Sequence, residues 1–161
     1  MSKGTIYIFC GKMASGKSTL AAQISQQNAL TLISEDALLG TLYQDQVVDV
    51  STYVQFSGKI KLAIKPILVD LLKNGTSIVL DFPANTVDQR KWIRDIVLQA
   101  GAHAEFHYLN VPDSICKARL RQRAVKEPER HATDTLDMFD AVTRFFEPPS
   151  NDEGFEIINH Q

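Results

Sequence analysis

The chain has 161 residues, of which 44% are hydrophobic and 22% are charged, and its formal net charge is -2. This length and composition predict one globular domain over residues 1–161, large enough for a hydrophobic core and too short for a second domain. The small negative charge disfavours a dedicated nucleic-acid-binding protein.

No signal for export or membrane insertion is visible in the sequence. No apolar stretch approaches the length that spans a bilayer, and the start of the chain lacks the charged head, apolar middle and cleavage site of a signal peptide. The two cysteines, Cys10 and Cys116, have no metal-ligand spacing, so we expect both to be small buried hydrophobic residues. We therefore expect a cytoplasmic protein.

The first element is a short apolar and β-branched run, Thr5 to Cys10, which predicts a buried strand stopped by Gly11. Gly16 and Lys17 follow, and apolar residues at helical spacing then predict a helix from Lys17 to about Gln27. The order of strand, glycine-bounded loop and helix is the context in which a phosphate-binding loop is found.

Each residue type in this loop suits a polyphosphate. Gly11 and Gly16 let successive backbone amides turn inward, and the helix start favours an anion. Lys17 brings a positive charge to the β- and γ-phosphates, and Ser18 offers a hydroxyl to Mg²⁺. We assign nucleotide contact to Gly11, Lys12, Met13, Ala14, Ser15, Gly16, Lys17, Ser18 and Thr19. The sequence therefore predicts binding of a nucleoside triphosphate.

A second apolar run, Leu30 to Ser34, predicts another strand, and Glu35 and Asp36 follow it. A carboxylate at a helix start can simply favour the helix dipole, and we favour that interpretation for Glu35. For Asp36 a role in the site is equally favoured, because the carboxyl edge of a parallel sheet faces the ligand crevice. A helix is then expected from Tyr53 to Lys73, with a kink or break at Pro66.

The third run, Thr76 to Leu80, ends in Asp81, as expected of a residue that holds the Mg²⁺ shell. A loop and a helix from Val87 to Ala100 follow. Asn85 and Arg90 are candidates for contacting substrate or nucleotide. The alternative, which we favour slightly, makes Asn85 a turn residue or helix cap and Arg90 a surface cation.

The fourth strand is expected from Ala104 to Val111, and we leave its His107 outside the site as a structural residue. A helix after Pro112 carries Arg119 and Arg123 on one face. Arginines there can offset the charge of a transferring phosphoryl group, although a basic surface helix is the ordinary alternative. Between positions 112 and 131 six basic residues stand against three acidic ones.

The charged connector from Val125 to Thr133 contains a proline and suits a lid, which we place at about residues 124–133. Thr133 is expected to cap a further helix, and Phe155 to Ile158 is the fifth predicted strand. Five strands alternating with helices predict a three-layer α/β/α fold with a parallel sheet.

With these motifs the chain resembles the small P-loop kinases, in the branch of zeta toxins, polynucleotide 5′-hydroxyl kinases and chloramphenicol phosphotransferase. It is most similar to uncharacterised bacterial ATP-binding (AAA-domain) proteins of that branch. The residues that carry the resemblance, besides the loop and the arginine helix, are Ile33–Asp36, Asp81–Thr86, Gln89, Arg90, Phe146–Pro149, Glu153 and Gly154. The chain departs from polynucleotide kinases in its lower positive charge, and it lacks the triple-glycine and paired acidic motifs of shikimate kinases.

The resemblance implies a P-loop NTPase sheet of strand order 2-3-1-4-5. It implies that Asp36 takes a proton from an acceptor hydroxyl and that Asp81 orients Mg²⁺ or touches the acceptor. The arginine helix would begin a lid, and Pro148 to Gly154 would lie near the adenine.

We expect an ATP-dependent and Mg²⁺-dependent kinase for a hydroxyl of a small-molecule or nucleotide-like acceptor. Lys17, Asp36, Arg119 and Arg123 would be its catalytic residues, and Ser18 and Asp81 would hold the metal. Two alternatives stay open. One is a polynucleotide 5′-hydroxyl kinase, and the other is an ATP-binding switch or toxin-like protein with little turnover.

Overall fold

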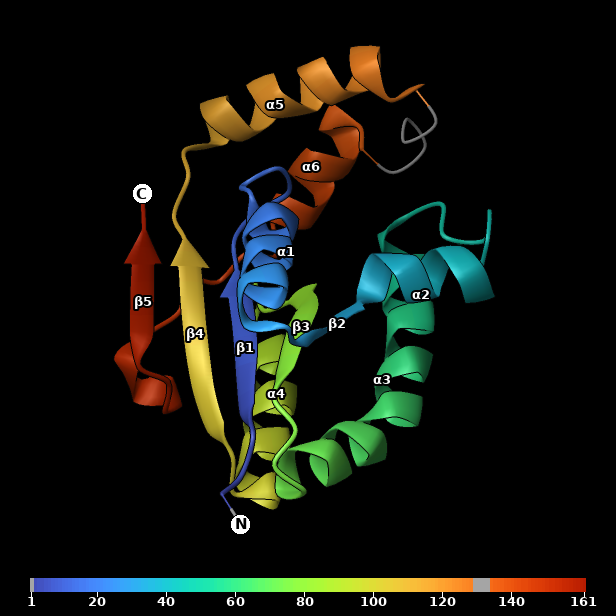
Figure 1. Ribbon diagram of the computed structural model, residues 1–161. Helices are drawn as coiled ribbons and strands as arrows, with labels where there is room; N and C mark the ends of the chain where they lie inside the picture. The colour runs from blue at the N-terminus through green and yellow to red at the C-terminus, as the bar shows by residue number, and fades with distance from the viewer. Residues whose placement is uncertain (1, 129–133) are drawn as a thin grey trace.

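The computed structural model describes residues 2–128 and 134–161 and is built on a five-stranded sheet (Figure 1). The strand order is β2-β3-β1-β4-β5, and every neighbouring pair runs parallel. Both the predicted parallel sheet and the strand order implied by the resemblance are confirmed. The strands are β1 (Thr5–Cys10), β2 (Thr31–Ser34), β3 (Ile78–Pro83), β4 (His103–Leu109) and β5 (Ile157–His160).

Helices cover both faces of this sheet. Figure 1 shows α1 in front of β1 and α4 behind it. α3 packs in the same hydrophobic cluster as α4, and α1 packs in a separate one, which gives the expected three layers. The helices are α1 (Lys17–Asn28), α2 (Glu35–Leu42), α3 (Val50–Lys73), α4 (Val87–Ala100), α5 (Asp113–Lys126) and α6 (Leu136–Thr143), with a short 3-10 turn η2 (Asn151–Glu153) before β5.

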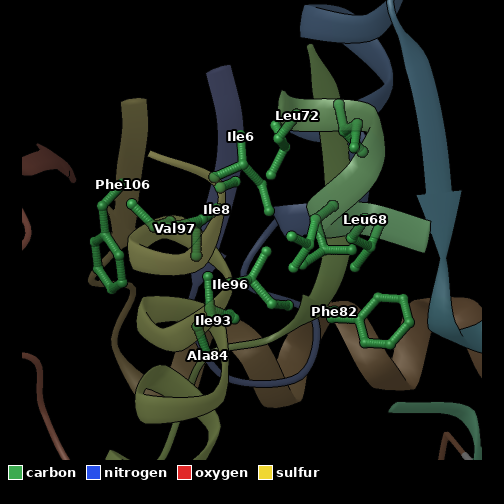
Figure 2. Close-up of a cluster of buried hydrophobic side chains, with 14 of the residues drawn as sticks. Ile6, Ile8, Leu68, Leu72, Phe82, Ala84, Ile93, Ile96, Val97 and Phe106 are labelled. Atoms are coloured by element: carbon green, nitrogen blue, oxygen red, sulfur yellow. The ribbon is translucent and has the colours of Figure 1, made fainter. Parts of the chain in front are cut away.

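Alternation along β1 divides its side chains between two hydrophobic clusters. Ile6 and Ile8 belong to the large cluster against α3 and α4, part of which Figure 2 shows. Phe9 belongs to a smaller cluster with Ala21 of α1. Successive side chains of a strand point to opposite faces, so a strand covered on both sides needs a continuous apolar run. This explains why the run predicted as the first strand lies at the centre of the sheet.

The parallel direction brings the carboxyl ends of all the strands to one edge. In Figure 1 this edge lies at the top, where the loop between β1 and α1 turns over. Ser34 at the end of β2 is the register partner of Asp81 in β3, and β3 is paired with β1. The segments that follow these three strands therefore meet at the same edge.

α5 crosses above this edge (Figure 1) and packs on α6 and on the loop between β1 and α1. Cys116 and Leu120 of α5, with Phe139 of α6, form a buried cluster with Ala14 of that loop. We call this group of four side chains the α5–α6 cluster. Burial of Cys116 here, and of Cys10 in β1, agrees with the expectation for both cysteines.

Several element boundaries differ from the predicted ones because of local capping. α3 begins at Val50 rather than Tyr53, since Asp49 caps it and forms a capping box with Thr52. The cap of α6 is Thr135, whose hydroxyl accepts from the Met138 amide, so the prediction that Thr133 caps this helix is wrong. Thr133 itself lies outside the described residues. β3 and β5 each begin two residues later than predicted.

Pro66 does not split α3, which continues from Val50 to Lys73 and bends along its length in Figure 1. The expected break is therefore wrong, while a bend is present. α3 is the longest of the described helices. In the part of the chain that the structure describes, none of the helices has the length and apolarity needed to cross a membrane.

Two glycines differ in the space that is available for a side chain, so substituting each by alanine should change stability in opposite directions. A Cβ on Gly4 would overlap the Thr76 carbonyl, whereas nothing lies within 4 Å of one on Gly58, in the middle of α3. We expect Gly4→Ala to lower the free energy of unfolding by about 1–3 kcal/mol through overpacking. Gly58→Ala should raise it by up to about 1 kcal/mol through helix propensity. Urea denaturation followed by circular dichroism measures both, and shifts of the same sign would contradict this account.

Candidate functional site

The loop from Gly11 to Thr19 joins β1 to α1 and has the backbone of an anion cradle. Ala14 and Gly16 have left-handed φ angles of 61° and 102°, which turn consecutive peptide groups in different directions. The α1 cap, Gly16, makes no side-chain hydrogen bond to the helix start. The first-turn amides therefore remain available as donors at the positive end of the helix dipole. This backbone fits a phosphate group.

Gly11 has no room for a side chain. A Cβ there would overlap Ser15 Oγ and would lie 3.1 Å from the Leu109 carbonyl oxygen. Ser15 is itself buried, and its Oγ has no hydrogen-bond partner among the described residues. The start and the middle of the loop are thus packed directly against each other.

Lys17 and Ser18 begin α1 at the rim of this loop. Lys17 is half-buried, while Ser18 and Thr19 are exposed in the first turn. A lysine and a hydroxyl so placed can meet a polyphosphate and its Mg²⁺. No group of three or more histidine, cysteine, aspartate or glutamate side chains in the described ranges could hold a metal ion.

Asp36 and Asp81 follow neighbouring strands and lie at the carboxyl edge of the sheet. Asp36 is exposed in the first turn of α2, and Asp81 is partly buried in β3 opposite Ser34. The topology thus brings both carboxylates to the edge on which the phosphate loop lies.

Glu35 lies in the first turn of α2, as our interpretation requires, but its role goes beyond favouring the helix dipole. The residue is 1% exposed, and its carboxylate accepts hydrogen bonds from Tyr53 Oη at 2.5 Å and Ser57 Oγ at 2.7 Å. Burial raises the pKa of this carboxyl, and the two hydroxyl donors oppose the rise. Burial, and then the Glu35 charge, also raises the Tyr53 pKa. These contacts fix the start of α2, and with it Asp36, against α3.

The arginines of α5 have different partners. Arg119 Nη1 donates to the Ala14 carbonyl of the phosphate loop at 3.1 Å, whereas Arg123 Nη1 is 3.4 Å from Asp134 Oδ2. Only Arg119 of this pair is brought to the loop. The predicted lid overlaps α5, which runs to Lys126, and its residues 129–133 lie outside the described residues.

Lys12 ties the start of α5 to the loop. Its ammonium is 2.6 Å from Asp113 Oδ1 and lies 5.0 Å from the centroid of the Phe146 ring. The ammonium is therefore already held by a carboxylate and by an aromatic face. Together with the Arg119 bond, this contact joins α5 to the loop at two points.

The interpretation that we favoured is wrong for Arg90 and only partly right for Asn85, which lies in the turn before α4 but does not cap that helix. The cap of α4 is Thr86, which forms a capping box with Gln89, so Asn85 is not the cap. Its Oδ1 instead accepts the Gly11 amide at 2.8 Å. Arg90 is 1% exposed and is therefore not a surface cation. Its guanidinium is paired with Glu153, with Nε 2.6 Å from Oε2.

His107 lies in β4 and takes part in packing. Its ring is stacked on Phe9 with centroids 5.4 Å apart, and its Nδ1 is 2.8 Å from His160 Nε2. Burial lowers the His107 pKa, which favours the neutral ring. These contacts agree with leaving it out of the site.

A family model described as an AAA domain matches residues 6–149, which is most of the chain. The chain belongs to the AAA domain family. None of the curated proteins matches this AAA domain. The resemblance to small P-loop kinases is confirmed at the level of family and fold.

Solved structures share the fold of this AAA domain at low sequence identity. A candidate kinase from Chloroflexus aurantiacus superposes with a TM-score of 0.74 at 16% identity, over 98% of this chain and 88% of that one. APS kinase CysC from Mycobacterium tuberculosis, in complex with AMPPNP and APS, gives 0.64 at 15%, over 94% and 86%. A sugar kinase from Janibacter sp. gives 0.63 at 14%, over 98% and 85%.

The buried Glu35 predicts that stability depends on pH. Because its pKa is raised above 4.5, the folded state binds this proton more tightly than the unfolded chain does. The parent should therefore lose stability as the pH rises from 4.5 through the raised pKa. Glu35→Gln removes this titration, so its free energy of unfolding relative to the parent should rise over the same window and then level off.

Urea denaturation of the parent and of Glu35→Gln, from about pH 4 to about pH 8, measures this difference. Asp152→Asn, at an exposed carboxylate of η2, serves as the control. A difference between Glu35→Gln and the parent that does not change with pH would contradict the assignment.

Proposed function

We propose that the protein is an ATP-dependent kinase that transfers the γ-phosphate of ATP to a hydroxyl of a small-molecule or nucleotide-like acceptor. The observation that carries this proposal is the phosphate loop, whose left-handed residues and open helix start lie at the same sheet edge as Asp36 and Asp81. An anion cradle next to carboxylates suits phosphoryl transfer, because one part holds the donor and the other part meets the acceptor.

Two of the solved structures with this fold support a kinase by their names. One is an APS kinase in complex with AMPPNP and APS, and the other is a sugar kinase. Both names describe small-molecule acceptors. They favour a small acceptor for this chain as well, although the sequence identities are only 15% and 14%.

In the proposed reaction the acceptor oxygen forms a bond to the γ-phosphorus while the bond to the β–γ bridging oxygen breaks, and ADP leaves. Asp36 takes the proton of the acceptor hydroxyl. Lys17 and the loop amides hold the β- and γ-phosphates. Ser18 and Asp81 would hold Mg²⁺, which supplies charge neutralisation at the phosphates when it is bound. Positioning and charge carry most of the rate in such a transfer.

Arg119 is the arginine that we assign to the transferring phosphoryl group. The bond from its guanidinium to the Ala14 carbonyl of the loop supports this assignment. Acting on the phosphoryl group would require it to exchange this carbonyl for phosphate oxygens, which are stronger acceptors. Arg123 would have to leave Asp134 to take the same role.

A polynucleotide 5′-hydroxyl kinase is the second candidate, because α5 is rich in basic residues. The contacts of this helix weaken it as a phosphate-binding surface. Lys117 is 3.2 Å from Asp140, Arg123 is paired with Asp134, and Arg119 is bonded to the loop. With these cations already engaged, fewer charges remain for a nucleic-acid backbone. We therefore favour a small acceptor.

Substitutions at Lys17 and Asp36 separate nucleotide binding from transfer. Lys17→Ala removes the cation at the phosphates, so we expect at least about tenfold weaker binding of Mg·ATP and loss of transfer. Asp36→Asn removes the base, so transfer should fall by about 10²–10⁴-fold while Mg·ATP affinity stays near that of the parent. Calorimetry measures binding. Transfer of labelled γ-phosphate to pooled metabolites, antibiotics, nucleosides and short oligonucleotides measures turnover.

In that screen Lys17→Ala is the blank. Parental transfer rates with Asp36→Asn would refute the base assignment. Transfer to oligonucleotides that falls steeply with salt would select the polynucleotide kinase. Tight ATP binding with no phosphorylated product would instead select a binding switch.

Arg119 and Arg121 form a matched pair on α5. Arg119 contacts the phosphate loop, whereas Arg121 is an exposed arginine two residues away. We expect Arg119→Ala to lower the transfer rate by at least about 10²-fold, because it removes charge stabilisation from the transferring phosphoryl group. Arg121→Ala should stay within about twofold of the parent, because an exposed surface charge contributes little. Equal losses of transfer rate in the two variants would show that the rate depends on the total positive charge of α5 and not on the position of Arg119.

A further inference from the structure

Asn85 forms hydrogen bonds through its side-chain oxygen, its backbone amide and its backbone carbonyl. Its Oδ1 accepts the Gly11 amide, its own amide donates to Gln89 Oε1, and its carbonyl accepts the Glu147 amide, each at 2.8 Å. Asn85 belongs to the turn between β3 and α4. It therefore connects three parts of the chain: the start of the phosphate loop, its own turn and the segment after α6.

The bond from Gly11 to Asn85 acts at the point where β1 becomes the phosphate loop. Gly11 is buried, so loss of its partner would leave an unsatisfied amide, which is unfavourable away from water. Gly11 also has no free space toward Ser15, whose Oγ a Cβ at Gly11 would overlap. A shift of Gly11 would therefore be passed to Ser15 and to Gly16, the cap of α1. The Asn85 oxygen thus helps to set where the loop amides point.

Arg90 holds the turn that carries Asn85. Its Nη1 donates to the Ala84 carbonyl at 3.0 Å, and its Nε and Nη2 donate to the two carboxylate oxygens of Glu153 at 2.6 and 3.0 Å. Nη2 also lies 3.4 Å from the Pro148 carbonyl oxygen. The guanidinium is thus compensated by a two-pronged ion pair and carbonyls, as a buried cation requires. Through it the segment before β5 is tied to the turn before α4.

From these contacts we propose that Asn85 is a positioning residue for nucleotide binding, which holds the phosphate loop in its binding shape through Gly11. The Arg90–Glu153 pair fixes the turn from which Asn85 acts. Asn85 does not itself touch the nucleotide in this scheme. The proposal rests on the proposed function in one respect only, which is that the loop binds a nucleotide.

Three variants test the proposal. Asn85→Ala removes the acceptor of the Gly11 amide, and Asn85→Asp keeps an oxygen in the same place. Thr86→Ala is the matched control, because it removes the α4 cap next door without touching Gly11. Thr86→Ala is expected to lower stability about as much as Asn85→Ala does, because each removes one hydrogen bond to a backbone amide. All binding is measured well below the melting temperature of each variant.

The first measurement is the amide proton shift of Gly11 in ¹H–¹⁵N spectra of the nucleotide-free protein. It should move upfield in Asn85→Ala, stay near the parental value in Asn85→Asp and not change in Thr86→Ala. The second is calorimetry with Mg·ADP. Asn85→Ala should bind about tenfold more weakly than the parent, as expected when one amide donor is misplaced. Asn85→Asp should recover affinity relative to Asn85→Ala, and Thr86→Ala should bind like the parent.

Two outcomes overturn the inference while leaving the proposed function in place. One is Mg·ADP binding by Asn85→Ala within twofold of a parent that binds. The other is an equal loss of affinity in Thr86→Ala, which would reduce the role of Asn85 to stability. A parent that binds neither Mg·ADP nor Mg·ATP overturns the proposed function, and the inference with it.

Discussion

The common direction of the five strands is the constraint on which the rest of the structure depends. Because every pair is parallel, each strand delivers its following segment to the same edge. β1 delivers the phosphate loop, β2 delivers Glu35 and Asp36, and β3 carries Asp81 and leads into the Asn85 turn. Residues far apart in the chain come together at this edge, although no sequence motif links them.

The parts that the sequence predicted well are those governed by neighbouring residues. Apolar runs identified the central strands, since both faces of each are covered, and β1 and α4 have the predicted bounds. The signal for the phosphate loop is also local, because glycines, a lysine and a serine at fixed spacing determine its backbone. The order of the sheet came from the family resemblance, because periodicity alone does not choose between topologies.

The residues whose roles were missed in whole or in part are those whose partners lie far along the chain. Glu35 pairs across 18 and 22 positions, Asn85 across 74, and Arg90 across 63. A single sequence does not reveal such pairs. We therefore assigned Glu35 and Arg90 the commonest roles of a carboxylate at a helix start and of an arginine on a helix. One signal was present for Glu35, because Tyr53 and Ser57 are four residues apart and so lie on one face of α3.

The α5–α6 cluster has a consequence for how the molecule responds to a ligand. Ala14 belongs both to the anion cradle and to this small core, so the loop cannot change its backbone without repacking Phe139 and Leu120. Four side chains make a modest core, and local opening begins in such regions. A ligand that locks the cradle would therefore also stiffen α6, which carries none of the proposed site residues, and its binding entropy would include the cost of ordering that helix.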